Sequence, residues 1–322
     1  MATLRTCAKY LDPNISSSWL WGGTGYAFSL TIHEGLCPSG PYVPVGKFDA
    51  LLPNVGVQVE QHTAKPDAPD FAARRAALFE IACKAIDAGY PVMGWSLRHI
   101  DWYPIFGYRD NDSYLFRNHD GRRHPYPHAK LGERAPGGLA IVAVVKLTEP
   151  AEPVVTVRDA FVFALKMAAG KYSDGKYSSG FAGYDAWIHA LQHPAAPPKD
   201  ATCFGHAFNA ACWGECRRRV VRFLVKARER LGRPDLNALL QEAETHYQSV
   251  SEEFKTLSRL FPCQPGCMAP MMARFRDDAL REQGAQILMT ARDVEEQGVK
   301  AIARLAVALG AAEADTLLAS CG

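Results

Sequence analysis

The chain has 322 residues, of which 48% are hydrophobic and 22% are charged, and its formal net charge is +2. This composition is typical of a globular protein that buries a sizeable core, either as one large domain or as two. The small net charge excludes the strongly basic character expected of a protein that binds nucleic acid or an anionic membrane surface.

The sequence indicates a soluble, cytoplasmic protein. No run of 18 apolar residues occurs, so we expect no transmembrane helix. Residues 1–11 carry Arg5 and Lys9 and lack the apolar stretch of a secretory signal. The nine cysteines of a chain without an export signal are expected to be reduced thiols.

The first 150 residues are predicted to mix helices and strands. Residues 2–11 form a helix that ends before a turn at Asp12-Pro13-Asn14, and a second short helix is expected through 19–21. The glycines of 22–25 interrupt regular structure before a strand over 26–32. Further along, we expect a helix over 69–88, strands over 91–95, 102–108, 113–117 and 139–146, and loops over 36–44 and 118–138.

The second half of the chain changes character. Helical periodicity is present over 156–169, 180–193, 205–231, 235–260 and 270–310, and no strand is predicted after Lys146. This order predicts an α+β protein, with an α+β core over 1–150 and a helical region over 151–322. The long, heptad-like apolar spacing of the last helix suggests that it projects or packs against a second subunit, as a homodimer through the C-terminal helices. Glu215 with 217–219 (RRR) is interpreted as a set of surface charges on a helix.

Four groups of residues follow one another in an order known from other proteins. They are Tyr10-Leu11 with 21–28 (WGGTGYAF), Gly94-Trp95 with 101–108 (DWYPIFGY), 180–188 (GFAGYDAWI), and 206–209 (HAFN) with 215–218 (ECRR). Together they span about residues 2–225 and resemble bacterial proteins related to double-glycine leader peptidases, grouped with the butirosin-biosynthesis acyltransferase N-terminal domain. The resemblance implies a papain-like core with an antiparallel sheet. In that fold, a cysteine at the start of the first helix is activated by a histidine on the facing sheet.

The resemblance places the nucleophile position near Thr3 and the histidine position at Asp101, six residues before Gly107. A carboxylate is ionised at pH 7 and is a poor base toward a thiol, so Asp101 does not replace the imidazole. Cys7 lies one helical turn after Thr3 and is either the nucleophile or a small buried hydrophobic residue. His99 lies two residues before Asp101, on the same strand face, and is an alternative base.

Other cysteines and histidines offer further candidates. His33 and Cys37 lie in a loop rich in Gly and Pro, as a relocated base and nucleophile, a pair of metal ligands, or residues that simply pack. A tetrahedral metal site would draw on Cys212, Cys216, Cys263 and Cys267, with Cys203 and His206 nearby in sequence. The Cys-x3-Cys spacing suits few structural zinc sites, so buried free thiols are favoured and no metal or cofactor is predicted.

Five aromatic residues are candidates for lining a ligand cleft, although large rings also dominate protein cores. They are Trp21, Tyr26, Trp95, Trp102 and Tyr103. Because Asp101 stands at the histidine position, we favour a protein that binds a small metabolite or a peptide on a degenerate cysteine-peptidase-like scaffold. One alternative is a thiol-dependent acyltransferase or amide hydrolase that uses Cys7 or Cys37, with His33 or His99 as base and Asp101 as an orienting carboxylate. The other is a metal-binding protein that uses its Cys and His side chains.

Overall fold

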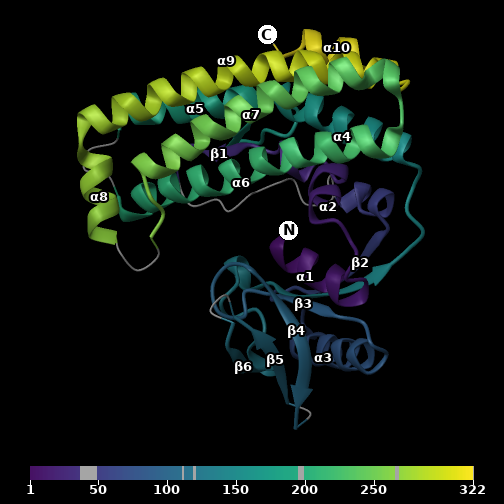
Figure 1. The fold of residues 1–322 in the computed structure, drawn as a ribbon. Helices are drawn as coiled ribbons and strands as arrows, with labels where there is room; N and C mark the ends of the chain where they lie inside the picture. Colours follow the sequence, from purple (N-terminus) through teal and green to yellow (C-terminus); the bar gives the residue numbers. More distant parts are fainter. Residues whose placement is uncertain (37–48, 111, 119–120, 195–198, 265–267, 322) are drawn as a thin grey trace. The chain divides into compact units, whose positions relative to one another are not determined.

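The computed structural model describes residues 1–36, 49–110, 112–118, 121–194, 199–264 and 268–321 (Figure 1). Over these ranges the fold is α+β, with antiparallel sheets and a helical second half, which confirms the predicted fold class at this level. None of the helices in the described ranges is long and apolar enough to cross a membrane.

The chain divides into two compact units, which we call the sheet unit (residues 1–17 and 56–150) and the helical unit (residues 18–55 and 151–322). The predicted α+β core over 1–150 includes residues 18–55. The structure places this segment in the helical unit because its aromatic side chains pack there: the rings of Trp19 and Phe28 lie 5.4 Å and 6.1 Å from that of Phe223.

The sheet unit is built on six antiparallel strands in the order β2-β7-β3-β4-β5-β6. They are β2 (Val57–Ala64), β3 (Val92–Trp95), β4 (Trp102–Arg109), β5 (Ser113–Arg117), β6 (Arg123–Pro127) and β7 (Ala140–Leu147). β6 corrects the predicted loop over 118–138, and β2 was not predicted. Both strands lie at the edges of the sheet, where polar side chains in β2 and prolines in β6 are tolerated.

Two helices cover this sheet. Val142 and Val144 of β7 belong to the cluster that contains Leu78 and Phe79 of α3 (Phe71–Asp87). Because strand side chains alternate between faces, Ile141 and its alternate neighbours point to the other face, where α1 (Ala2–Leu11) contacts β3, β4 and β7. β7 is therefore buried on both faces, as its uninterrupted apolar run suggests.

In its described residues, the helical unit combines eight α-helices with a two-stranded ribbon. The helices are α2 (Ser17–Gly23), α4 (Pro153–Ala168), α5 (Gly180–Gln192), α6 (Asp200–Leu231), α7 (Asn237–Leu260), α8 (Met268–Arg276), α9 (Asp278–Ala308) and α10 (Ala314–Ala319). The strands are β1 (Thr31–His33) and β8 (Tyr177–Ser179). β8 corrects the expectation of no strand after Lys146: it exists because it pairs with the distant β1, with Ile32 opposite Ser178.

The predicted strand over 26–32 is wrong in its first half. Gly25 adopts a left-handed φ of 74° and starts a turn, so that Tyr26–Phe28 forms a short 3-10 helix and only Thr31–His33 is a strand. The predicted helix over 270–310 is two helices, because the side chain of Asp277 caps a new helix by accepting a hydrogen bond from the Leu280 backbone N–H at 3.1 Å.

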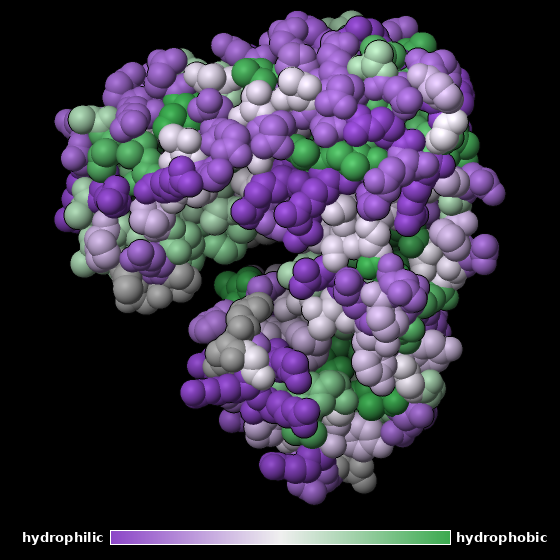
Figure 2. All heavy atoms as spheres, viewed as in Figure 1, coloured by the Kyte–Doolittle hydropathy of each residue, from purple (hydrophilic) through white to green (hydrophobic). Residues whose placement is uncertain are grey.

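The apolar face of α9 packs inside its own chain. α9 contacts α7, α5, α4 and α10, and residues such as Leu288, Ile302 and Leu305 are buried by these contacts. Figure 2 shows hydrophilic residues over much of the outward side of α7 and α9. The apolar spacing of the last helix is thus accounted for within the chain, and the homodimer stays a prediction.

Gly180 joins β8 to α5, and its backbone lies close to that of Met167 near the end of α4. Its φ is +61°, and a Cβ there would collide with the backbone carbonyl oxygen of Met167. We expect Gly180→Ala to lower the free energy of unfolding by about 2–3 kcal/mol, measured by urea denaturation. Gly175→Ala is the matched control, because a Cβ at Gly175 has no atom within 4 Å. Equal stability of the two variants would contradict the prediction.

Candidate functional site

The structure brings the predicted nucleophile and histidine positions close together. Thr3, the second residue of α1, is buried, and its hydroxyl donates a hydrogen bond to the backbone carbonyl of Trp102 at 2.7 Å. Asp101, the residue before Trp102, accepts a hydrogen bond from the Trp102 backbone N–H at 2.7 Å. A hydroxyl and a carboxylate therefore stand where the resemblance implies a thiol and an imidazole.

Cys7 lies in the middle of α1 and is only 1% exposed. Burial raises the pKa of its thiol to about 12. At pH 7 such a thiol is thiolate in only about one molecule in 10⁵, and the thiolate is the form that attacks. In this position Cys7 behaves as a small hydrophobic residue between the helix and the sheet.

The other residues of the predicted sheet-unit site lie around the connection between β3 and β4. His99 is exposed in this connection, and its backbone N–H donates to the hydroxyl of Tyr103 at 3.1 Å. Trp95 and Trp102 face each other across the two strands with ring centroids 5.4 Å apart, and both are half-buried. Tyr103 is fully buried in the core on the α3 side, and desolvation raises the pKa of its hydroxyl.

The remaining predicted site residues belong to the helical unit. Trp21 and Tyr26 are buried and meet edge to face at 5.3 Å, with the guanidinium of Arg219 5.3 Å above the Trp21 ring. His33 accepts a hydrogen bond from the Gly35 backbone N–H at 3.0 Å through Nδ1. Cys37 lies outside the described residues.

The predicted metal ligands do not gather in the described part of the chain. Within it, no group of three or more His, Cys, Asp and Glu side chains could hold a metal ion. Cys203, Cys212, Cys216 and Cys263 are not in disulfides, while Cys267 lies outside the described residues. Burial is the main cause that raises the pKa of Cys216, which is typical of an unreactive thiol.

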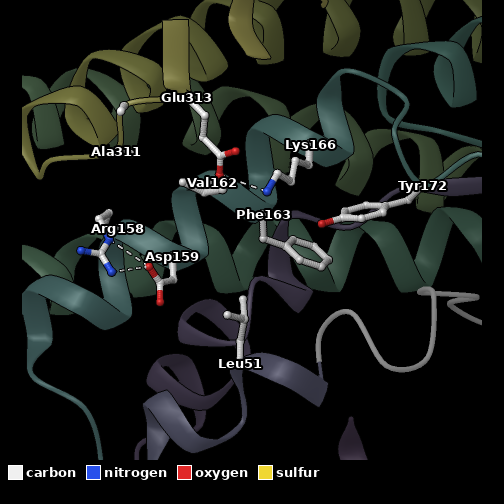
Figure 3. A pocket seen from close by; sticks show the side chains of 10 residues that line it. Leu51, Arg158, Asp159, Val162, Phe163, Lys166, Tyr172, Ala311 and Glu313 are labelled. Carbon is white, nitrogen blue, oxygen red and sulfur yellow. Dashed lines mark hydrogen bonds and ion pairs between the residues drawn. The ribbon is translucent and has the colours of Figure 1, made fainter. Parts of the chain in front are cut away.

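The helical unit contains a cleft that the sequence analysis did not identify. It has a volume of about 610 Å³, within the range of small-molecule sites. One side is α4, and the others are the short 3-10 helix Asp49–Leu51, Tyr172 and the segment before α10 (Figure 3). Its lining consists of Leu51, Arg158, Asp159, Val162, Phe163, Lys166, Tyr172, Ala311, Ala312 and Glu313.

Two ion pairs stand at this cleft. Arg158 donates to Asp159 at 2.9 Å, and Lys166 lies 3.0 Å from Glu313. These four side chains are 28–52% exposed, so solvent and a ligand can both reach them. Their charges balance, which disfavours a strongly charged ligand of either sign.

The floor between the ion pairs is apolar and aromatic. Val162 and Phe163 lie between Arg158 and Lys166 on α4, and the ring of Phe163 lies 5.0 Å from that of Tyr172. Burial, with a smaller contribution from the nearby Glu313 charge, raises the pKa of Tyr172 to about 12. Its hydroxyl therefore keeps its proton at neutral pH and can donate a hydrogen bond.

Part of this site was readable from the sequence. Arg158, Val162 and Lys166 are spaced i, i+4 and i+8 within the predicted helix 156–169, which places them on one face. Nothing in the sequence linked that face to Leu51 or to Glu313, which come from segments more than 100 residues away in either direction.

Residues 1–17 and 56–150 form a compact unit with an antiparallel sheet. The particular family relationship rests on the residues quoted above and stays a prediction. Comparison of the sequence with models of known protein families found no match, and a search of curated proteins found no significant relative.

Proposed function

We propose that this protein binds a small metabolite or a peptide without transforming it chemically, on a scaffold derived from a papain-like cysteine peptidase. The observation that carries the proposal is the pair of residues at the reactive positions. The Thr3 hydroxyl is engaged with the Trp102 carbonyl, and Asp101 follows in place of the imidazole. This arrangement lacks both the nucleophile and the base of thiol chemistry.

The state of Cys7 supports the same proposal. A catalytic cysteine needs a lowered pKa and access to substrate, whereas Cys7 has a raised pKa and is buried. His99, the alternative base, is exposed on the β3–β4 connection. A thiol enzyme would therefore depend on another cysteine, with Cys37 as the remaining candidate.

The cleft along α4 supports the binding part of the proposal. Its volume suits a small organic molecule, and it offers apolar contacts between oriented polar groups. We propose this cleft as the ligand site. The sheet unit supplies the papain-like scaffold in this proposal, and its antiparallel sheet with α1 and α3 on opposite faces supports that assignment.

Cysteine alkylation tests whether the protein is a thiol enzyme. We expect iodoacetamide to modify Cys7 at least about 100-fold more slowly in the native protein than in urea, because the thiolate is scarce and shielded. Peptide mass spectrometry over pH 6 to 10 gives the rate for each cysteine. Cys7→Ala identifies the Cys7 peptide and should leave the other rates unchanged.

A fast native reaction at Cys7 or Cys37, with a pKa well below about 8.5, would contradict the proposal. Turnover of an amide or acyl substrate that is lost in Cys37→Ser would replace it with the thiol-enzyme alternative.

A further inference from the structure

The two carboxylates of the α4 cleft, Asp159 and Glu313, differ in the acceptor oxygens that remain for a ligand. Both carboxylate oxygens of Asp159 already accept hydrogen bonds: Oδ1 from Arg158 and Oδ2 from Nδ2 of Asn54 at 3.0 Å. Glu313 is more exposed, at 52%, and the ion pair with Lys166 uses its Oε1. Among the hydrogen bonds between described residues, its Oε2 is not used. Glu313 is thus the better acceptor for a ligand ammonium group.

The two cations of the cleft, Lys166 and Arg158, also differ in the hydrogen-bond donors that remain for a ligand. An ammonium bound at Glu313 would lie beside Lys166, the residue already paired with that carboxylate. The other cation, Arg158, is eight residues away on α4, which is about 12 Å along the helix axis. Arg158 is held by Asp159 through Nε and Nη2. A guanidinium has five N–H donors, so Arg158 retains donors for a carboxylate.

The part of the cleft between Glu313 and Arg158 is apolar and favours a ligand with an apolar middle. Val162, Phe163 and Tyr172 form this part of the cleft, and the neighbouring Ala311 adds no polar side chain. An extended peptide spans about 3.3–3.6 Å per residue, so about three to four residues match the roughly 12 Å of helix axis between Arg158 and Lys166, the residue paired with Glu313.

We infer that the α4 cleft selects a short zwitterionic peptide of about three to four residues, with its free α-amino group at Glu313, its free carboxylate at Arg158 and an apolar side chain between them. This inference rests on the binding function proposed above and adds the chemical class of the ligand. Charge neutrality of the cleft fits a ligand that carries one charge of each sign.

Calorimetric titration of the full-length protein at low ionic strength tests the inference. The probes are the tripeptide Ala-Phe-Ala, its N-acetylated form, its C-terminal amide and the form blocked at both ends. We expect the free tripeptide to bind most tightly and each blocked end to raise Kd by roughly three- to tenfold, because one charge-assisted contact is lost.

Variants assign each preference to its side chain. In Arg158→Gln the free and amidated peptides should bind equally, and in Glu313→Gln the free and acetylated peptides should bind equally. Val162→Trp should abolish binding by filling the cleft. Arg233→Gln is the control, because Arg233 pairs with Asp235 on the surface outside the cleft and should leave all four affinities unchanged. Circular dichroism establishes that each variant is folded.

Equal affinity for the four peptides, no binding of any of them, or preferences that survive in Arg158→Gln and Glu313→Gln would each overturn the inference. The proposed binding function would then be judged separately, by whether another metabolite binds in a manner that Val162→Trp abolishes. Cleavage or modification of Ala-Phe-Ala, detected by mass spectrometry after incubation, would instead contradict the proposed function.

Discussion

Replacing Glu295 with alanine should destabilise the helical unit by about 3–5 kcal/mol, because it leaves the Arg217 charge buried without its counter-ion. Arg217 and Glu295 have side chains 1% and 6% exposed and form two hydrogen bonds, Nη2 to Oε1 at 2.8 Å and Nε to Oε2 at 2.9 Å. Arg217 also donates to the backbone carbonyl of Ser29, and Tyr184 donates to Glu295. Urea denaturation followed by tryptophan fluorescence measures the loss, since Trp187 and Trp213 are buried in this unit.

The neighbouring residue provides a matched control. Glu296 pairs with Lys300 at 2.7 Å on the surface and is 37% exposed. Glu296→Ala should change the unfolding free energy by less than about 1 kcal/mol. The double variant Arg217→Met with Glu295→Leu removes both charges and should recover much of the stability that Glu295→Ala loses. A Glu295→Ala protein as stable as Glu296→Ala would show that Arg217 finds another partner or reaches water.

Stability should also fall in acid because of one buried histidine. His206 is fully buried, and desolvation lowers its pKa from 6.5 to about 3. The neutral ring accepts a hydrogen bond from Trp187 Nε1 at 2.8 Å and lies 4.3 Å from the ring of Phe261. Below pH 6.5 the unfolded chain binds a proton at this residue and the folded chain does not. The stabilising contribution is therefore complete above about pH 6.5 and is lost progressively as the pH falls toward 3.

The size of this effect follows from linkage. Each unit of pKa difference corresponds to about 1.4 kcal/mol, so the contribution lost between pH 6.5 and 3 has an upper limit of about 5 kcal/mol. Other groups titrate in the same range, so the measured quantity is the pH dependence of wild type minus that of His206→Gln. Glutamine keeps an acceptor for Trp187 and does not titrate. Urea midpoints between pH 4 and 7.5 provide the comparison.

A second histidine on the surface controls for the loss of a titratable group. His189 lies exposed on α5, and His189→Gln should keep the wild-type pH profile. If His206→Gln loses stability in acid as steeply as wild type, protonation of His206 is not what destabilises the protein.

Arg217 also illustrates why sequence patterns misassign a buried charge. From the sequence, Arg217 is predicted to be a surface charge together with Arg218, Arg219 and Glu215. In the structure, Arg218 and Arg219 pair with Glu215. Arg217 points to the opposite side of α6, toward Glu295, 78 residues later in the chain. The spacing along α6 places these arginines on different faces of the helix. Arg217 can be buried because α9 places Glu295 beside it as a counter-ion.

Elements that carry a strong hydrophobic pattern of their own were predictable from the amino-acid sequence. The apolar run over 139–146 predicted β7, and the periodicity of 235–260 predicted α7, because buried strands and amphipathic helices repeat their hydrophobic residues at characteristic spacings. The change from mixed elements to helices after Lys146 also indicated the α+β class. The replacement of histidine by Asp101 was visible in the sequence, given the resemblance.

Tertiary structure decided the features that depend on distant partners. β6 and β8 carry weak strand patterns and form because neighbouring strands supply their hydrogen bonds. Burial of Cys7 against the sheet sets its pKa, and no local pattern measures that desolvation. The α4 cleft brings together Leu51, Arg158 and Glu313, and the first and last of these are 262 positions apart in the sequence. Such sites follow from packing, because a helix face identifies its own side chains but not the segments that close over them.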